Sequence, residues 1–145
     1  MRLLTISAIL IMASSVHAED LVVLGRLKAI EKDVPHCGVF YTGAVTEYEV
    51  SRVISGTYAE KRIFVVHGCI EMPRSGEHGT LRSFVIGDVH KLVLVRENLY
   101  GIGVFNDKAV PQQFVTYFCK SVDRYIKDRA QSHNSTLQRT AFGGR

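Results

Sequence analysis

The chain has 145 residues, of which 46% are hydrophobic and 22% are charged, and its formal net charge at pH 7 is +4. This length suits one domain, which buries roughly two thirds of its unfolded surface and needs few disulfide bonds or other cross-links. The charge excess is far below that of a typical nucleic-acid-binding domain, so we expect no nucleic-acid partner.

The first eighteen residues have the pattern of a secretory signal peptide. Met1 and Arg2 form a short basic start, residues 3–13 are almost wholly apolar, and Val16 and Ala18 suit cleavage ahead of Glu19. The apolar run is about half of the ~20 residues that span a bilayer, and no later segment is longer. We therefore expect a secreted or periplasmic protein, cleaved after Ala18, with no transmembrane segment.

Alternating apolar and polar residues then predict a series of strands. Residues 21–30 form the first, and residues 39–54 form a long second strand with a bulge near Ser51-Arg52, where the alternation slips. Residues 62–69 are apolar on both faces, which predicts a strand buried on both sides. Shorter strands are expected at residues 81–86, 90–96 and 99–105.

The period changes after Pro111. Apolar residues now recur at spacings of three and four, which predicts an amphipathic helix over residues 111–130. Residues 131–145 show no period and are expected to be a disordered tail. The prediction is a single, mainly β domain over residues 19–130: a small OB-like closed or partly closed antiparallel barrel of five to six strands with a C-terminal amphipathic helix.

The three cysteines are Cys37, Cys69 and Cys119. Two are expected to pair in an oxidising compartment. Cys37 precedes the long second strand and Cys69 ends the third, so a hairpin would bring them to the same edge. We predict the Cys37–Cys69 disulfide, with Cys119 a buried thiol on the apolar face of the expected helix. A pairing that includes Cys119 remains an alternative.

The same edge offers a second interpretation, since His36 adjoins Cys37 and His67 lies two residues before Cys69. Two imidazoles and two thiolates would suit zinc or copper. A periplasmic metal-binding protein is therefore one alternative function. Otherwise no cofactor is expected.

The polar loop after Cys69 carries Glu71, Arg74, Glu77 and His78, which we take as the candidate binding surface. Carboxylates beside a histidine also suit acid–base chemistry, so a small secreted hydrolase using Glu77 and His78, or Cys37 as a thiol, is a further alternative. No serine lies in a G-x-S-x-G elbow. We therefore expect an exported, non-enzymatic binding or interaction domain for a protein or glycan.

Residues 24–94 resemble the netrin-like, tissue-inhibitor-of-metalloproteinases type of OB barrel. The matching elements are the first strand, the extended segment 45–56 with its Ser55-Gly56 turn, the strand ending in His67-Gly68-Cys69, and Phe84–Asp88 leading into His90–Leu94. The resemblance implies an OB barrel. Inhibitors of that family place an N-terminal cysteine on the target's catalytic zinc, whereas the N-terminus expected here is Glu19, so that mechanism does not carry over.

Overall fold

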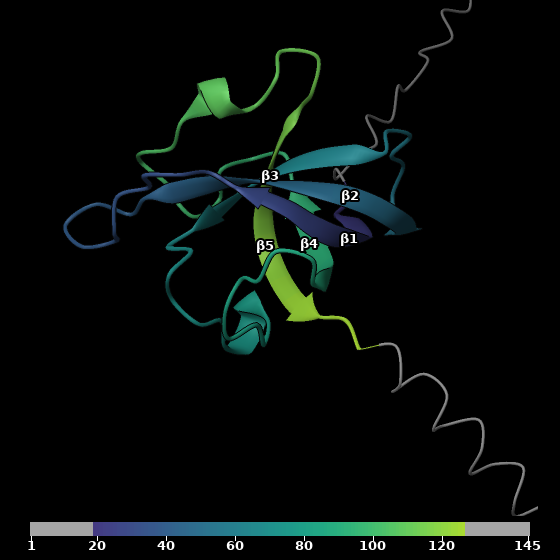
Figure 1. Cartoon of the computed structure of the whole chain (residues 1–145), viewed down its shortest axis with the longest axis horizontal. Helices are drawn as coiled ribbons and strands as arrows, with labels where there is room; N and C mark the ends of the chain where they lie inside the picture. Colours follow the sequence, from purple (N-terminus) through teal and green to yellow (C-terminus); the bar gives the residue numbers. More distant parts are fainter. Residues whose placement is uncertain (1–18, 127–145) are drawn as a thin grey trace, which may run out of the picture.

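Five strands close into a barrel in the computed structural model, which describes residues 19–126 (Figure 1). The expected signal peptide, the end of the expected helix and the expected tail lie outside these residues. The strands are β1 (Leu21–Ile30), β2 (Gly43–Ser55), β3 (Arg62–Gly68), β4 (Val89–Val95) and β5 (Thr116–Arg124). Two short 3-10 turns, η1 (Gly76–His78) and η2 (Asp107–Ala109), lie in the loops.

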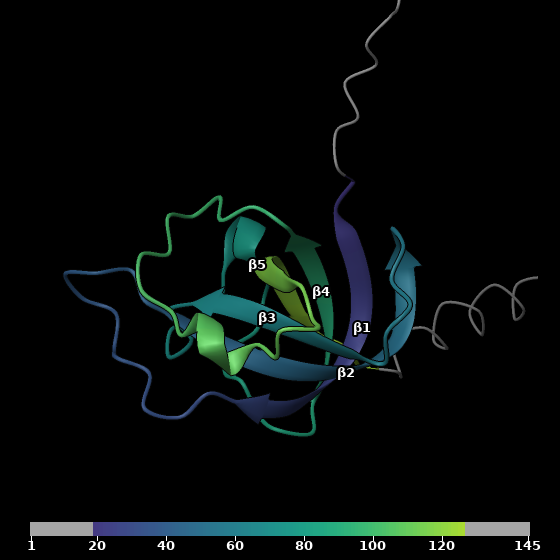
Figure 2. The ribbon, with the colours of Figure 1, turned by 90° about the horizontal axis from the view of Figure 1, so that it is seen from above.

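The order of strands around the barrel is β1-β2-β3-β5-β4, and β4 closes the ring against β1 (Figure 2). The β3–β5 pair is parallel, while the other four neighbouring pairs are antiparallel. A closed, mainly β, five-stranded barrel confirms the predicted OB-like class.

The long strand β2 contains the expected bulge. Leu24 pairs with Arg52 and the next residue, Gly25, pairs with Val50, so Ser51 is the extra residue. Bulges increase the local twist and bend of a strand, which helps a sheet to close on itself.

The barrel strands bury side chains on both faces. The interior cluster comprises Leu21, Val23, Leu27, Tyr48, Ile63, Val65, Leu81, Leu92, Leu94, Tyr117 and Val122. A second cluster lies outside the barrel wall and comprises Val45, Phe64, Val66, Ile102, Val110 and Phe118. Strand β3 contributes to both clusters, as its two apolar faces predicted.

The predicted C-terminal helix is wrong for the described residues, because Thr116–Arg124 is strand β5. In this strand Val93 pairs with Ser121 and Leu94 with Cys119, so Lys120 is bulged out. The bulge interrupts the two-residue period, and burial of Tyr117 inside and Phe118 outside adds apolar residues on both faces. Together these features imitate helical spacing.

The strands expected at residues 81–86 and 99–105 are also wrong, since both segments are irregular. Each strand of the closed ring already pairs on both sides, and Val104 makes only an isolated bridge, with Thr42. Instead Leu81 and Ile102 each bury one side chain, so the segments cover the barrel as loops. Residues 39–42 likewise belong to the loop before β2 rather than to the strand.

Within residues 19–126, no helix has the length and apolar character needed to cross a membrane.

Candidate functional site

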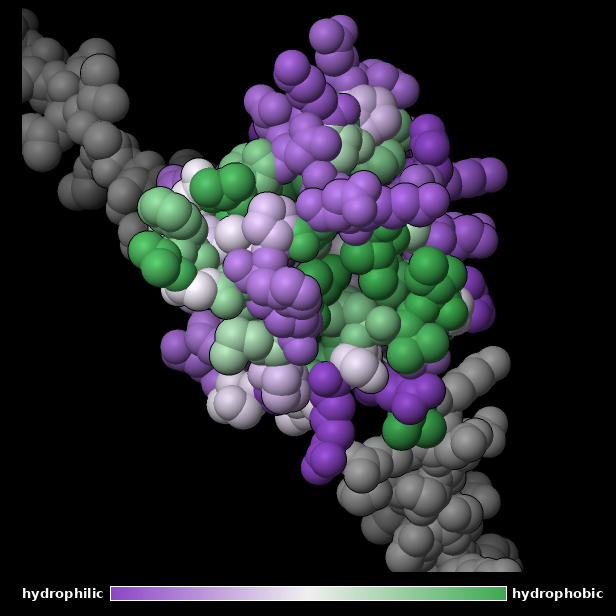
Figure 3. All heavy atoms as spheres, turned by 60° about the vertical axis from the view of Figure 1, so that its left-hand side comes forward, coloured by the Kyte–Doolittle hydropathy of each residue, from purple (hydrophilic) through white to green (hydrophobic). Residues whose placement is uncertain are grey.

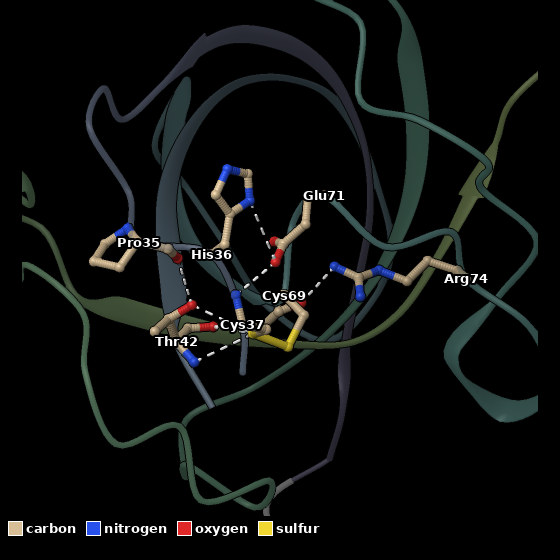
Figure 4. The surroundings of a disulfide bond; sticks show 8 residues. Pro35, His36, Cys37, Thr42, Cys69, Glu71 and Arg74 are labelled. Atoms are coloured by element: carbon tan, nitrogen blue, oxygen red, sulfur yellow. Dashed lines mark hydrogen bonds and ion pairs between the residues drawn. A yellow bond between two sulfur atoms is a disulfide. The ribbon is translucent and has the colours of Figure 1, made fainter. Parts of the chain in front are cut away.

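The predicted disulfide between Cys37 and Cys69 is present and joins the β1–β2 loop to the end of β3 (Figure 4). Thr42 organises the surrounding backbone: its carbonyl accepts from the Cys69 N–H at 2.9 Å and its hydroxyl donates to the Pro35 carbonyl at 2.8 Å. Glu71 accepts a hydrogen bond from the Cys37 N–H at 2.6 Å. This N–H is the largest cause of the lowered pKa of Glu71, so the Glu71 carboxylate holds the loop in place.

A pocket of ≈ 210 Å³ opens beside the disulfide, and we call it the Arg74 pocket. Its floor is formed by the end of β3 with the adjoining Cys69 and by the middle of β5, including His67 and Cys119. Tyr41, Tyr100 and Met72 supply aromatic and apolar walls. The basic residues of the lining are Arg74, His78 and Lys120, and no Asp or Glu is among the described residues that line it.

Arg74 is half-buried and lines this pocket. Its backbone N–H donates to the Leu81 carbonyl at 2.7 Å, and its Nη2 donates to the Gly68 carbonyl at 2.7 Å (Figure 4). Its guanidinium lies 5.4 Å from the centre of the Phe84 ring. No carboxylate of residues 19–126 forms an ion pair with it.

The other two basic residues of the lining have carboxylate partners. Lys120 Nζ lies 2.7 Å from Asp20 Oδ2, and His78 Nε2 lies 3.6 Å from Glu77 Oε1. The His78 ring also makes an edge contact with Tyr100, with ring centres 5.3 Å apart. Arg74 is therefore the basic residue of the lining whose charge is left for an external anion.

The loop that carries Arg74 is fixed to β5. Gly79 forms an isolated bridge with Val122. The Thr80 N–H and hydroxyl both donate to Asp123 Oδ1, at 2.9 and 2.8 Å. These contacts hold η1 and Arg74 over the floor of the pocket, so the site is largely preformed.

Beneath the pocket, two buried histidines share one tyrosine hydroxyl. The Tyr48 hydroxyl lies 3.2 Å from His67 Nε2 and 3.1 Å from His90 Nδ1. The Phe84 ring packs edge-on against both imidazoles, with ring centres 4.7 and 5.8 Å away. Among the described atoms, His90 Nε2 is buried without a hydrogen-bond partner.

Burial dominates the ionisation of this group. It lowers the pKa of His67, with the Arg74 charge as a second cause, and it lowers the pKa of His90. The same burial raises the pKa of the Tyr48 hydroxyl. Both imidazoles are therefore neutral at pH 7, and the group is a structural polar core.

Cys119 is a half-buried thiol in the floor of the pocket, on β5 rather than on a helix. Its Sγ lies 3.3 Å from the Ser121 carbonyl, and burial raises its pKa to about 12. The protonated thiol is a poor nucleophile.

The structure separates the residues of the predicted metal site. His67 points into the barrel, while the His36 side chain is 89% exposed and approaches only Glu71, at 3.9 Å. Cys37 and Cys69 are bonded to each other and so hold no thiolate for a metal. Among residues 19–126, no three His, Cys, Asp or Glu side chains are grouped to share a metal ion.

The predicted binding residues take different roles. Arg74 and His78 line the pocket, Glu71 supports the disulfide loop, and Glu77 is an exposed partner of His78. The sequence interpretation did not group Tyr48, Phe84 and His90 with the candidate site. The two-residue alternation of the strand could have placed His90, because it shares the inward face of β4 with Leu92 and Leu94.

A second hollow of ≈ 430 Å³ is lined in part by Glu19, Asp20, Gly56 and Arg96, and it contains none of the predicted site residues. Because two of the predicted binding residues, Arg74 and His78, line the Arg74 pocket, we take it as the candidate site. Comparisons of the chain with protein-family models, curated proteins and solved structures find no match, so the netrin-like resemblance stays a likeness of residue pattern.

Proposed function

We propose that this protein is an exported, non-enzymatic binding domain that recognises a protein or glycan outside the cytoplasm through an anionic group held in the Arg74 pocket. The leader pattern of residues 1–18 supports export. The Cys37–Cys69 disulfide is consistent with an oxidising compartment.

The observation that carries the proposal is the half-buried Arg74 guanidinium, which has no carboxylate partner among residues 19–126 and lies in a pocket whose described lining contains no acidic residue. A partly desolvated charge is costly unless it is paired. Its planar fork of N–H donors matches a carboxylate, and charge-assisted pairs of this kind are stronger than neutral hydrogen bonds. An anionic ligand would complete the arrangement.

The size of the pocket limits what enters it. Its ≈ 210 Å³ is below the ~300–1,000 Å³ typical of sites for drug-sized ligands. One acidic side chain or one acidic sugar of a longer ligand suits this space. OB barrels use loops of this kind to bind extended ligands, although that support is an analogy of fold alone.

The test compares binding of wild-type protein and Arg74→Gln to arrays of acidic and neutral glycans and of acidic and neutral peptides. We expect wild type to prefer the acidic probes, and Arg74→Gln to weaken their binding at least about tenfold, the scale of one charge-assisted hydrogen bond. Arg82→Gln is the matched control, because Arg82 is exposed in the same loop region and lies outside the pocket lining.

Thermal unfolding separates lost recognition from lost folding, since Arg74 also supports the Gly68 carbonyl. Arg74→Lys keeps the charge and should restore part of the binding. Equal binding of acidic probes by wild type, Arg74→Gln and Arg82→Gln would contradict the proposal.

A further inference from the structure

We infer that the partner is a protein, and that it places a carboxylate in the Arg74 pocket while its apolar side chains cover an exposed loop tip beside the pocket. The inference rests on the proposed function and names the class of partner. The loop tip comprises Gly38, Val39, Phe40 and Tyr41, and we call it the apolar tip.

The apolar tip carries three consecutive exposed large side chains, Val39, Phe40 and Tyr41. Val39 is 96% exposed and Phe40 is 68% exposed, the two highest values among the large apolar side chains of residues 19–126. Figures 1 and 2 both show the segment between β1 and β2 extending away from the strands. Adjacent exposed apolar residues of this kind mark interaction sites.

A disulfide bond and hydrogen bonds fix the base of the apolar tip. Cys37 and Thr42 bracket it, with the Thr42 N–H 3.4 Å from Cys37 Sγ, and the disulfide fixes Cys37 to Cys69. Just beyond the tip, the Gly43 N–H donates to the Val104 carbonyl at 2.7 Å. A projecting group on a fixed base loses little entropy on binding, so the tip is preorganised for contact.

The apolar tip and the Arg74 pocket form one surface, because Tyr41 belongs to both. Its ring lies against the backbone of Gly68, where any side chain would collide with it. Met72, another lining residue of the pocket, is 53% exposed. On the face that brings this end of the molecule forward, apolar patches lie beside hydrophilic side chains (Figure 3). A ligand would therefore meet apolar groups around a single cation.

This combination favours a protein over a sugar or a lipid surface. A sugar would stack on the exposed rings of Phe40 and Tyr41 but would leave the aliphatic side chains of Val39 and Met72 in water, whereas apolar side chains of a protein would cover both kinds of surface. Anionic membranes attract a basic surface around an apolar insertion. Here Asp33 and Glu71 accompany Lys32 and His36, so the charge around the tip is mixed.

The experiment selects a phage-displayed random-peptide library against the full chain, isolated from the exported fraction. We expect the selected peptides to share Asp, Glu or a free terminal carboxylate next to large apolar residues. A synthetic peptide of that consensus should bind at least tenfold more weakly after its acidic residue is changed to the amide. That change should have no effect on binding to Arg74→Gln, which a double-mutant cycle would show.

The apolar contact is tested with Phe40→Ser, which should weaken binding of the consensus peptide at least tenfold. The matched control is Ile86→Ser, since Ile86 is 62% exposed and lies outside the pocket lining. Equal binding by wild type and Phe40→Ser, or selected peptides without a shared acidic and apolar pattern, would overturn the inference.

The remaining outcomes separate the inference from the proposed function. Binding of an acidic glycan that depends on Arg74 but not on Phe40 would overturn the inference and leave the proposed function standing. Sedimentation with phosphatidylcholine–phosphatidylglycerol vesicles that is lost in Phe40→Ser would assign the tip to lipid and also overturn it. If no acidic probe of any class depends on Arg74, both fail.

Discussion

Gly79 lies against the backbone of Val122 so closely that a Cβ at this position would overlap the Val122 carbonyl oxygen. Gly79 also has φ +99° and ψ −164°, a conformation that residues with side chains almost never adopt. This contact anchors the loop that carries Arg74 to the strand that forms the floor of its pocket. Glycine is therefore required here for both space and backbone conformation.

We expect Gly79→Ala to lower the free energy of unfolding by more than about 2 kcal/mol, because it combines backbone strain with a steric collision. Gly76→Ala is the matched control: Gly76 has φ +60° in the same loop, but a Cβ there meets nothing within 4 Å. We expect Gly76→Ala to lower the free energy of unfolding by about 1 kcal/mol, because only the positive φ opposes the added side chain. Urea unfolding followed by circular dichroism measures both, and similar losses for the two variants would contradict the packing argument.

Loss of the disulfide should destabilise the fold through the unfolded state. The bond joins residues separated by 32 positions, and closing such a loop contributes about 3–4 kcal/mol in the chain-entropy model. We expect the double variant Cys37→Ser, Cys69→Ser to lose about that amount in urea unfolding. Cys119→Ser, which leaves the bond intact, should lose much less, and equal losses would argue against the Cys37–Cys69 pairing.

Tyr48→Phe tests the shared hydroxyl of the barrel core. The substitution preserves the ring but leaves His67 Nε2 and His90 Nδ1 without their common partner. We expect a loss of about 2–4 kcal/mol, since each unsatisfied buried polar group costs about 1–3 kcal/mol. Tyr58→Phe removes a hydroxyl that donates to the Arg62 carbonyl at an exposed position. This variant should lose less free energy of unfolding. A larger loss for Tyr58→Phe would be inconsistent with this account.

The two buried histidines should make the fold sensitive to acid. Burial lowers the pKa of His67 and of His90 below the ordinary value of 6.5, so the unfolded chain takes up protons that the native chain does not. Their contribution to stability is therefore constant above about pH 6.5 and declines as the pH falls below it, by up to about 1.4 kcal/mol per pH unit for each histidine.

Urea midpoints measured between about pH 7.5 and pH 5 test this dependence, because most carboxylates titrate below that range. His36→Asn is the control variant, because the His36 side chain is 89% exposed and lies outside the barrel core. His67→Gln should have a shallower slope even if its overall stability is lower. An unchanged slope in His67→Gln would remove this histidine as the cause.

The sequence predicted the first three strands because their patterns are local. Ile63-Phe64-Val65-Val66 is apolar at consecutive positions, which a two-sided strand requires, and the slip after Val50 located the bulge at Ser51. The Cys37–Cys69 pairing followed from the hairpin that these strands form. Each of these features depends on neighbouring residues or on one short connection.

Other features depend on contacts between distant parts of the chain. The sequence of β5 has the apolar spacing of a helix because the bulge at Lys120 and the outer cluster around Phe118 alter its two-residue period. The sequence indicates Arg74 as a candidate, but its lack of an ion pair depends on where Asp20 and Glu77 lie, beside Lys120 and His78. The apolar tip was assigned to a strand because Val39-Phe40-Tyr41 has strand-forming residues, whereas the staple at Cys37 and Thr42 holds it as a loop.

The parallel ladder between β3 and β5 also sets the order of assembly. Phe64 pairs with Thr116, so the ring cannot close until a segment about fifty residues downstream has emerged. Until then β3 and β4 each present an unpaired edge, the feature through which nascent β proteins aggregate. A newly made molecule would thus depend most on holding chaperones during the interval before Thr116–Arg124 docks, and a truncation that removes this last strand should yield inclusion bodies rather than a shortened barrel.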